Sequence, residues 1–242
     1  MTPTELRNSR LAERMIKNLA RRNMQAFYCP TAKEAVSKVL ELIPAGSSVT
    51  WGGSMSIRDI GIPDALRAKG CYDVLDRDLV EGDEAKVQMY VRAFTTDVYL
   101  SSANAISEDG VIVNIDGNGN RVAAITWGPK RVIFVIGLNK VAQTVEAALA
   151  RARSTASPIN AARFDIKTPC QTDGVCHNCN SPESICNYVH FLRNSPRGKH
   201  TVILVGEPLG YCYAQRAAGS NTWCQALGSA ASLVEERCVI TQ

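Results

Sequence analysis

Two apolar segments indicate the fold class: Arg131-Val-Ile-Phe-Val-Ile136 and Thr201-Val-Ile-Leu-Val205. Both are short and rich in β-branched residues, and neither alternates between apolar and polar positions. Such runs are typical of strands buried on both faces, as in parallel sheets that carry helices on each side. A helix is expected soon after the first segment, from about Lys140 to Arg153. We therefore expect an α/β fold with a mostly parallel open sheet and flanking helices.

Helices and strands alternate in the part of the chain that precedes these segments. Leu11, Met15 and Leu19 recur at four-residue spacing, which predicts an amphipathic helix near the N-terminus. A capping box at Thr31-Ala-Lys-Glu34 predicts the beginning of a second helix. Strands are also predicted at 48–51, 72–75 and 97–100, and helices at 57–60, 63–69 and 83–94.

A hairpin is predicted for residues 111–126. The apolar segments 111–115 and 121–126 flank Asp116-Gly-Asn-Gly-Asn120, and its Gly and Asn residues suit positive φ angles. The loop is not a dinucleotide-binding fingerprint, because the third glycine is missing and because it is expected to join two strands. Near the C-terminus, a weak helix is predicted at 226–234 and a short strand at 238–240.

The composition is that of an ordinary globular protein. The 242 residues are 45% hydrophobic and 21% charged, and no apolar run approaches the roughly 20 residues of a membrane span. The polar N-terminal segment does not resemble a secretory signal, so we expect a cytoplasmic protein without membrane insertion. The net charge of +4 comes from dispersed basic residues, which does not favour nucleic acid as a partner. We predict one domain, 1–242, with 154–198 as an inserted cysteine-rich lobe.

Four of the nine cysteines lie close together in that lobe: Cys170, Cys176, Cys179 and Cys186. Glycine, proline and asparagine residues between them predict a loop-like chain, on which short spacings let thiolates converge on one inorganic centre. The spacing C-x5-C-x2-C-x6-C is compact and contains a single close pair, whereas zinc sites usually have two such pairs, or one pair plus histidines, about a dozen residues apart. It is nearer to the plant-type ferredoxin pattern. We predict an iron–sulfur cluster, with zinc and free thiols as the alternatives.

Polar loops at the ends of predicted strands are candidate ligand sites. Gly52, Gly53 and Ser54 follow the strand at 48–51 and precede a helix, an arrangement that suits an anion. Asn104 follows the strand at 97–100, where open α/β sheets bind ligands. Lys130, just before the strand at 131–136, is a candidate for holding a carboxylate or phosphate.

Two carboxylates are candidates for proton transfer or nucleophilic attack. Asp109 belongs to the polar stretch that begins at residue 101, and Glu207 follows the strand at 201–205. Each also has a simple structural interpretation, as part of a solvated turn or as an acid at the end of a strand. A histidine-based catalytic triad is not expected, because His177, His190 and His200 all lie in or near the cysteine lobe.

Several motifs together resemble the lactate-utilisation (LUD) domain family. They are Gly52-Gly-Ser-Met-Ser56, the run from Ala103 to Arg121, Gly128-Pro-Lys130 and Val135-Ile-Gly-Leu-Asn-Lys140. The resemblance covers about residues 4–210, and the segment from Cys170 to Asn187 is similar to a subgroup of the family. It implies a fold like that of ribose-phosphate isomerases and CoA transferases. It also implies a role in the oxidation of lactate to pyruvate beside iron–sulfur or dehydrogenase partner subunits.

Three hypotheses follow for the function. In the first, the chain binds a small anionic metabolite such as a hydroxy acid, with the cluster nearby. In the second, it is a non-redox isomerase or transferase for phosphorylated or CoA-linked substrates, with structural zinc and with Asp109 or Glu207 as base or nucleophile. In the third, it is a non-catalytic subunit of a redox complex. Whether catalysis occurs in this chain stays open, and a homodimer is one expected oligomeric state.

Overall fold

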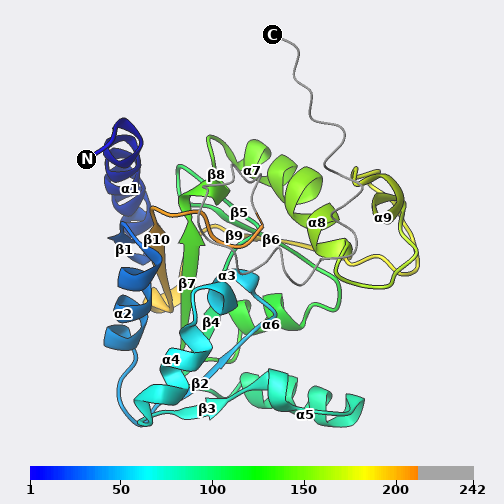
Figure 1. Ribbon diagram of the computed structural model, residues 1–242, viewed down its shortest axis with the longest axis horizontal. Coiled ribbons are helices and arrows are strands. Elements are labelled where there is room, and N and C mark those ends of the chain that lie inside the picture. The colour runs from blue at the N-terminus through cyan, green and yellow to red at the C-terminus, as the bar shows by residue number, and fades with distance from the viewer. Residues whose placement is uncertain (212–242) are drawn as a thin grey trace. The chain divides into compact units, whose positions relative to one another are not determined.

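The computed structural model describes residues 1–211, and Figure 1 shows their arrangement. The predicted helix at 226–234, the predicted strand at 238–240 and Cys212, Cys224 and Cys238 lie outside the described residues. None of the helices in the described part is both long and apolar enough to cross a membrane.

A six-stranded parallel sheet forms the centre of the described chain. Its order is β1-β10-β7-β4-β2-β3, and every neighbouring pair is parallel. The strands are β1 (Gln25–Cys29), β2 (Ser48–Trp51), β3 (Asp73–Leu75), β4 (Val98–Ser101), β7 (Arg131–Gly137) and β10 (His200–Val205). The two apolar segments that suggested the fold class are the adjacent strands β7 and β10, which pair along six residues. The predicted α/β class is confirmed.

Helices cover both faces of this sheet, and their beginnings follow from local sequence. The first five are α1 (Pro3–Arg21), α2 (Ala32–Leu42), α3 (Met55–Asp59), α4 (Ile62–Lys69) and α5 (Asp83–Ala93). Helix α1 begins with a reciprocal capping box between Thr2 and Glu5, and it buries the predicted stripe of Leu11, Met15 and Leu19. Helix α2 begins where expected, because the Thr31 side chain accepts a hydrogen bond from the Glu34 amide.

A smaller mixed sheet packs beside the large one. Its order is β8-β5-β6-β9, formed by β5 (Ala105–Ser107), β6 (Ile112–Asp116), β8 (Val141–Ala142) and β9 (Tyr188–Leu192). Helix α7 (Val145–Arg151), a π-helical turn (Ala152–Ala156) and α8 (Ser157–Ala161) follow β8, and α7 and the π-helical turn pack against this sheet. Strands β1, β5, β8 and β9 have no counterpart in the sequence-based prediction, because each is short or carries exposed positions.

The predicted hairpin at 111–126 is wrong. Its first arm is β6, but the second arm is a helix, α6 (Asn120–Thr126), which buries Ala124 and Ile125. Gly119 adopts φ 78° before the helix, and the Asp116 carboxylate accepts a hydrogen bond from the Val122 amide. An apolar run this short has no periodicity that separates helix from strand, so the tertiary contacts decide. The loop at 116–120 therefore joins a strand to a helix.

The segment predicted as a cysteine lobe, 154–198, is partly regular. It contains α8, α9 (Pro169–Asp173), β9 and a 3-10 turn (Pro196–Gly198). Strand β9 pairs with β6 in antiparallel register from Tyr188 to Leu192. Between α9 and β9 the chain has no helix or strand, and it carries three of the four clustered cysteines. Pairing through β9 joins this segment to the smaller sheet.

Candidate functional site

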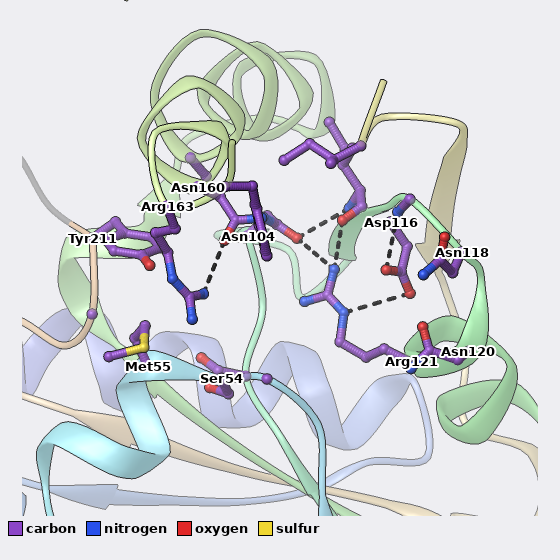
Figure 2. Close-up of a pocket in the computed structure, with 18 of the residues that line it drawn as sticks. Ser54, Met55, Asn104, Asp116, Asn118, Asn120, Arg121, Asn160, Arg163 and Tyr211 are labelled. Atoms are coloured by element: carbon purple, nitrogen blue, oxygen red, sulfur yellow. Dashed lines mark hydrogen bonds and ion pairs between the residues drawn. The ribbon is translucent and has the colours of Figure 1, made fainter. Parts of the chain in front are cut away.

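A cleft of about 780 Å³ opens at the carboxyl edge of the large sheet. Loops that follow β2, β3, β4, β7 and β10 supply Gly53, Arg77, Ser102, Lys140 and Gly210 to its lining. This is the edge at which open α/β sheets bind ligands, because neighbouring strands release their loops there side by side. The opposite wall comes from the loop after β6, from α8 and from residues 182–187. Figure 2 shows side chains from these walls facing one another.

Positive charge dominates the cleft. Among the described residues that line it, the basic ones are Arg58, Arg77, Arg121, Lys140, Arg151 and Arg163, and the acidic ones are Asp116 and Glu183. Concave surfaces with an excess of one sign of charge concentrate the field and attract ligands of opposite sign. The described lining is therefore suited to an anionic ligand.

Arg121 is held in place on the wall formed by the loop after β6 (Figure 2). Its Nη2 donates to the Asn104 side-chain oxygen at 3.1 Å and to the Ile115 carbonyl at 2.6 Å, and its Nε lies 3.8 Å from Asp116 Oδ2. The Ile115 amide donates to the same Asn104 oxygen at 3.0 Å. The Asn104 side chain therefore links the segment after β4 to β6 and orients Arg121.

Lys140 lies at the base of the cleft and is 6% exposed. Its Nζ donates to Ser56 Oγ at 2.6 Å, to Ser102 Oγ at 3.0 Å and to the Ala103 carbonyl at 3.2 Å. Lysine is rarely buried to this degree without specific partners. The amine is thus fixed at a point where loops from three neighbouring strands meet.

Arg163 and Arg151 contribute from the helical wall. Arg163 Nη1 donates to Asn160 Oδ1 at 3.1 Å, and its guanidinium lies 5.9 Å from the centre of the Tyr211 ring. Arg151 donates to the backbone carbonyls of Asn104, Asn139 and Tyr211. Burial raises the pKa of the Tyr211 hydroxyl although nearby arginines oppose this change. Arg151 ties the loops together, whereas Arg163 presents its guanidinium to the cleft.

A second, smaller cavity of about 60 Å³ is lined by all four clustered cysteines. Cys170, Cys176, Cys179 and Cys186 thus line one cavity, and the pKa of Cys186 is raised by burial and by the other three thiols. The Thr168 hydroxyl lies 3.4 Å from Cys170 Sγ. Ile115, Ser184 and Ile185 line both this cavity and the cleft, so the two are adjacent.

The donor set is four thiols, which are ligands for both zinc and iron–sulfur clusters. In the part of the chain that the structure describes, no three Cys, His, Asp or Glu side chains are spaced to hold one metal ion. Four thiolates around one tetrahedral zinc would lie only about 3.8 Å apart, given zinc–sulfur bonds of about 2.3 Å. In a [4Fe–4S] cluster each thiolate binds a different iron atom, whereas in a [2Fe–2S] cluster two thiolates bind each iron.

The structure brings together several of the predicted anion-binding residues. Gly53, Ser54 and Asn104 line the cleft. Gly52 lies behind this surface, where a Cβ atom would come within 2.7 Å of the Tyr99 hydroxyl. Its role is therefore close packing of the loop against β4.

Lys130, Asp109 and Glu207 are not among the residues that line the cleft. Lys130 Nζ binds Asp97 Oδ1 at 2.7 Å at the opposite, amino end of the strands. The Asp109 carboxylate accepts hydrogen bonds from Arg22 and Ser107, and it connects the smaller sheet to the end of α1. Glu207 Oε2 accepts a hydrogen bond of 2.8 Å from the Ala32 amide at the start of α2. Each of the three has a structural partner that accounts for its position.

Six basic cleft residues are missing from the sequence-based candidates: Arg58, Arg77, Arg121, Lys140, Arg151 and Arg163. Lys140 carried a usable signal, because it closely follows the carboxyl end of the apolar strand β7. Arg121, on the misassigned second arm of the hairpin, could be found only once α6 was recognised. Arg151 and Arg163 flank the π-helical turn and α8, and no local pattern in the sequence marks them as cleft residues.

An open parallel α/β sheet with a basic cleft at its carboxyl edge and a four-cysteine cavity beside it defines the class of protein. The chain belongs to the LUD domain family, whose model matches residues 12–205. The crystal structure of a DUF162 family protein from Deinococcus radiodurans is similar, with a TM-score of 0.48 and 14% identity over 82% of this chain and 98% of that chain.

Two isomerases were also found among solved structures. Ribose 5 phosphate isomerase A from Neisseria gonorrhoeae has a TM-score of 0.34 and 15% identity, over 47% of this chain and 54% of that chain. Ribose 5-phosphate isomerase A from Methanocaldococcus jannaschii has a TM-score of 0.32 and 17% identity, over 48% and 54%. No curated protein matches this chain.

Proposed function

We propose that the chain binds a small anionic metabolite in the cleft and an iron–sulfur cluster in the cysteine cavity, as part of the oxidation of lactate or a related hydroxy acid. One observation carries the proposal: a cleft rich in basic side chains adjoins a cavity lined by four cysteines. Membership of the LUD domain family supports it. A bound cluster would supply one-electron redox chemistry beside the ligand.

The anion would be held by groups that are already oriented. Arg163 offers a planar guanidinium, which suits a carboxylate because two parallel N–H donors match its two oxygens. Arg121 faces the same space and is fixed by Asn104 and Asp116. Prior fixation lowers the entropy lost when the ligand binds.

The cysteine cavity supports the second half of the proposal. Cys170, Cys176, Cys179 and Cys186 would be the ligands, and the Thr168 hydroxyl beside Cys170 would donate to its sulfur. Ile115 and Ile185 line both the cavity and the cleft and, beside Ser184, make the shared wall largely apolar. An apolar wall limits water at the thiolates, which protects a cluster from hydrolysis.

Anion binding is tested with Arg163→Gln. Calorimetric titration of the full chain with L-lactate and with inorganic phosphate should give a dissociation constant that rises about 10- to 100-fold in the variant, because a charge-assisted hydrogen-bonding group is lost. Arg14→Gln is the matched control, since Arg14 is an exposed α1 residue paired with Glu108 outside the cleft. Equal affinity in the wild type and in Arg163→Gln would contradict the proposed anion site.

Cluster binding is tested by anaerobic purification, iron and sulfide analysis and optical spectra. The wild type should hold iron and show charge-transfer absorption, whereas Cys176→Ser should lose most of both. Cys71→Ser is the control, because Cys71 lies outside the cysteine cavity. A colourless protein with stoichiometric zinc would favour a structural metal, and a metal-free protein after reconstitution would leave no role for the cavity in redox chemistry.

The size of the cleft favours a second candidate function. A three-carbon acid fills only a small part of about 780 Å³, and several arginines also suit phosphate groups. We therefore keep a non-redox isomerase or transferase for phosphorylated or CoA-linked substrates, with zinc as a structural metal. The same titration with ribose 5-phosphate and with acetyl-CoA decides between them: tight binding of either, with no binding of lactate, supports the second candidate.

A further inference from the structure

Three side chains from adjacent strand ends meet at the base of the cleft. Ser56 lies in α3 just after β2, Ser102 follows β4 directly, and Lys140 follows β7. These strands are consecutive in the sheet order β7-β4-β2. The Lys140 amine lies 2.6 Å from Ser56 Oγ and 3.0 Å from Ser102 Oγ, and all three residues line the cleft.

The group is buried and ordered by its surroundings. Ser56 is 2% exposed, Ser102 is 4% exposed and Lys140 is 6% exposed. Ordering a long lysine side chain costs rotamer entropy, and burying its amine costs solvation. The Ala103 carbonyl and Ser102 Oγ both take part in fixing the amine. Lys140 Nζ donates in each of these contacts, so the base is the amine after it has lost one proton, and its 2.6 Å separation from Ser56 Oγ is within the range in which a general base takes a proton from a hydroxyl.

A glycine packs closely against the serine hydroxyl. A Cβ atom at Gly210 would come within 2.5 Å of Ser56 Oγ and 3.5 Å of Lys140 Nζ, and Gly210 adopts φ 61°. Both the space and the backbone conformation therefore disfavour any larger residue. The loop after β10 therefore passes close over the Ser56–Lys140 pair.

We propose that Ser56 is a nucleophile and Lys140 its general base, in acyl transfer from an anionic acyl ester or thioester. Ser56 Oγ forms a bond to the acyl carbon while its proton passes to Lys140 Nζ. The bond from the acyl carbon to the leaving oxygen or sulfur then breaks, and that atom takes the proton from Lys140. Water attacks the acyl-serine with Lys140 again as base, which releases the acid and restores Ser56. No oxidation state changes, and Ser102 is a positioning residue that holds the amine.

This inference goes beyond the proposed function, because it needs neither the cluster nor the lactate site. Covalent labelling tests it directly. The full chain, without reconstituted iron, is treated with a fluorophosphonate, and the adduct is mapped by mass spectrometry. One adduct is expected, on Ser56, with fluoride as the leaving group. Ser56→Ala should abolish it, and Lys140→Met should slow it by about 100-fold or more.

Ser37→Ala is the matched control and should label at the wild-type rate. Ser37 is an exposed serine on α2 whose hydroxyl donates to the Lys33 carbonyl. Ser102→Ala should slow labelling and Ser102→Thr should restore it, which tests the positioning role even if Lys140→Met does not fold. Circular dichroism shows which variants are folded. Absence of an adduct on Ser56 in the folded wild type, or unchanged rates in both folded Lys140→Met and Ser102→Ala, would overturn the inference.

Discussion

Asn104 and Asp109 belong to one polar stretch of the sequence but have different roles in the structure. Strand β5 runs between them and carries Asp109 away from the cleft to the end of α1, where Arg22 binds it. Asn104 stays at the end of β4 and orients Arg121. Asn104 and Asp109 therefore lie at two separate places in the structure. The strand between them, β5, is buried at all three positions, so no alternation of polar and apolar residues marks it as a strand in the sequence.

The buried His200 makes stability depend on pH. Its Nε2 lies 2.9 Å from the Ile125 carbonyl, to which it donates, and its Nδ1 lies 3.0 Å from Ser195 Oγ. Burial lowers its pKa from 6.5 to about 4. Between these values the unfolded chain binds more protons, so the free energy of unfolding falls as pH drops, by about 3 kcal/mol in total.

Urea unfolding at pH 7.5, 5.5 and 4.0 measures this loss. His200→Gln should show a weaker fall in the free energy of unfolding over the same range, because the titrating group is gone. His177→Gln is the control, since the His177 side chain is 47% exposed beside Asp173. A pH profile of His200→Gln identical to that of the wild type would contradict the assignment.

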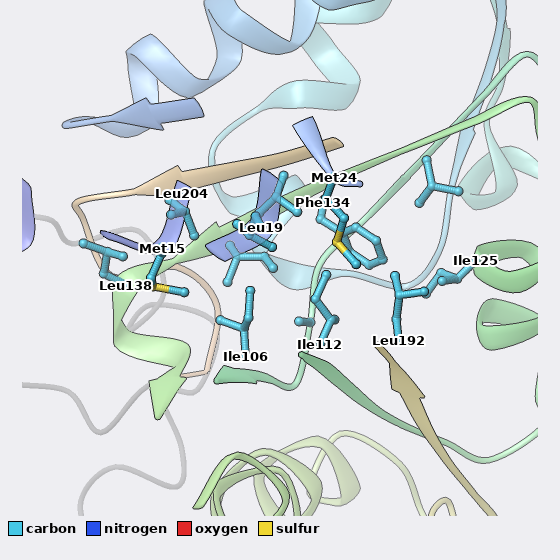
Figure 3. Close-up of a cluster of buried hydrophobic side chains, with 14 of the residues drawn as sticks. Met15, Leu19, Met24, Ile106, Ile112, Ile125, Phe134, Leu138, Leu192 and Leu204 are labelled. Atoms are coloured by element: carbon cyan, nitrogen blue, oxygen red, sulfur yellow. The ribbon is translucent and has the colours of Figure 1, made fainter. Parts of the chain in front are cut away.

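Strand β7 contributes buried side chains to the hydrophobic clusters on both faces of the large sheet. Val132, Phe134 and Ile136 face the cluster that includes α1 and the smaller sheet, as Figure 3 shows around Phe134, whereas Ile133 and Val135 face the cluster under α2 and α4. This alternation of faces follows from the two-residue period of a strand. Because both faces are buried, every position from 132 to 136 is apolar, and the segment could be recognised from sequence.

The turn that leads into β7 requires glycine at position 128. Gly128 adopts φ 93°, and a Cβ atom there would come within 2.7 Å of the Phe94 Cα. Gly128→Ala should therefore be destabilising by several kcal/mol, since backbone strain and a backbone clash add. Gly46→Ala is the matched control, because Gly46 has φ 80° but nothing within 4 Å of the added atom.

Chemical denaturation measures both glycine variants. The free energy of unfolding of Gly46→Ala should fall by only about 1–2 kcal/mol, which is the cost of a left-handed backbone conformation for alanine. The difference between the variants then reports the contact between the turn and the end of α5. Equal losses in the free energy of unfolding for the two variants would mean that the turn relaxes and that the close approach to Phe94 does not affect stability.

At the scale of the described chain, an irregular segment lines both the cleft and the cysteine cavity. Residues 174–187 have no helix or strand, yet they supply lining both to the cleft and to the cysteine cavity. Few regular hydrogen bonds hold this segment, so its local stability is expected to be low. Ligation of four cysteines would cross-link it to α9 and strengthen it.

Limited proteolysis tests this coupling. Anaerobically reconstituted protein should be cleaved between Gly174 and Asn187 at least several-fold more slowly than the metal-free protein, because a bound cluster removes the open forms that a protease needs. Cys176→Ser should be cleaved at the metal-free rate under both conditions. Equal cleavage rates for loaded and metal-free wild type would show that the cysteines do not brace the segment.

The α/β class, the apolar central strands and the helix beginnings at Thr31 and Pro63 could be recognised in the amino-acid sequence, because strand burial and helix capping act over a few neighbouring residues. The clustering of four cysteines was visible for the same reason. The cleft was not, because Arg121, Lys140 and Arg163 come from distant segments and meet only after two sheets pack together. The choice of helix rather than strand at α6 also depended on that packing, since the short apolar run at 122–125 satisfies either geometry locally and its surroundings decide.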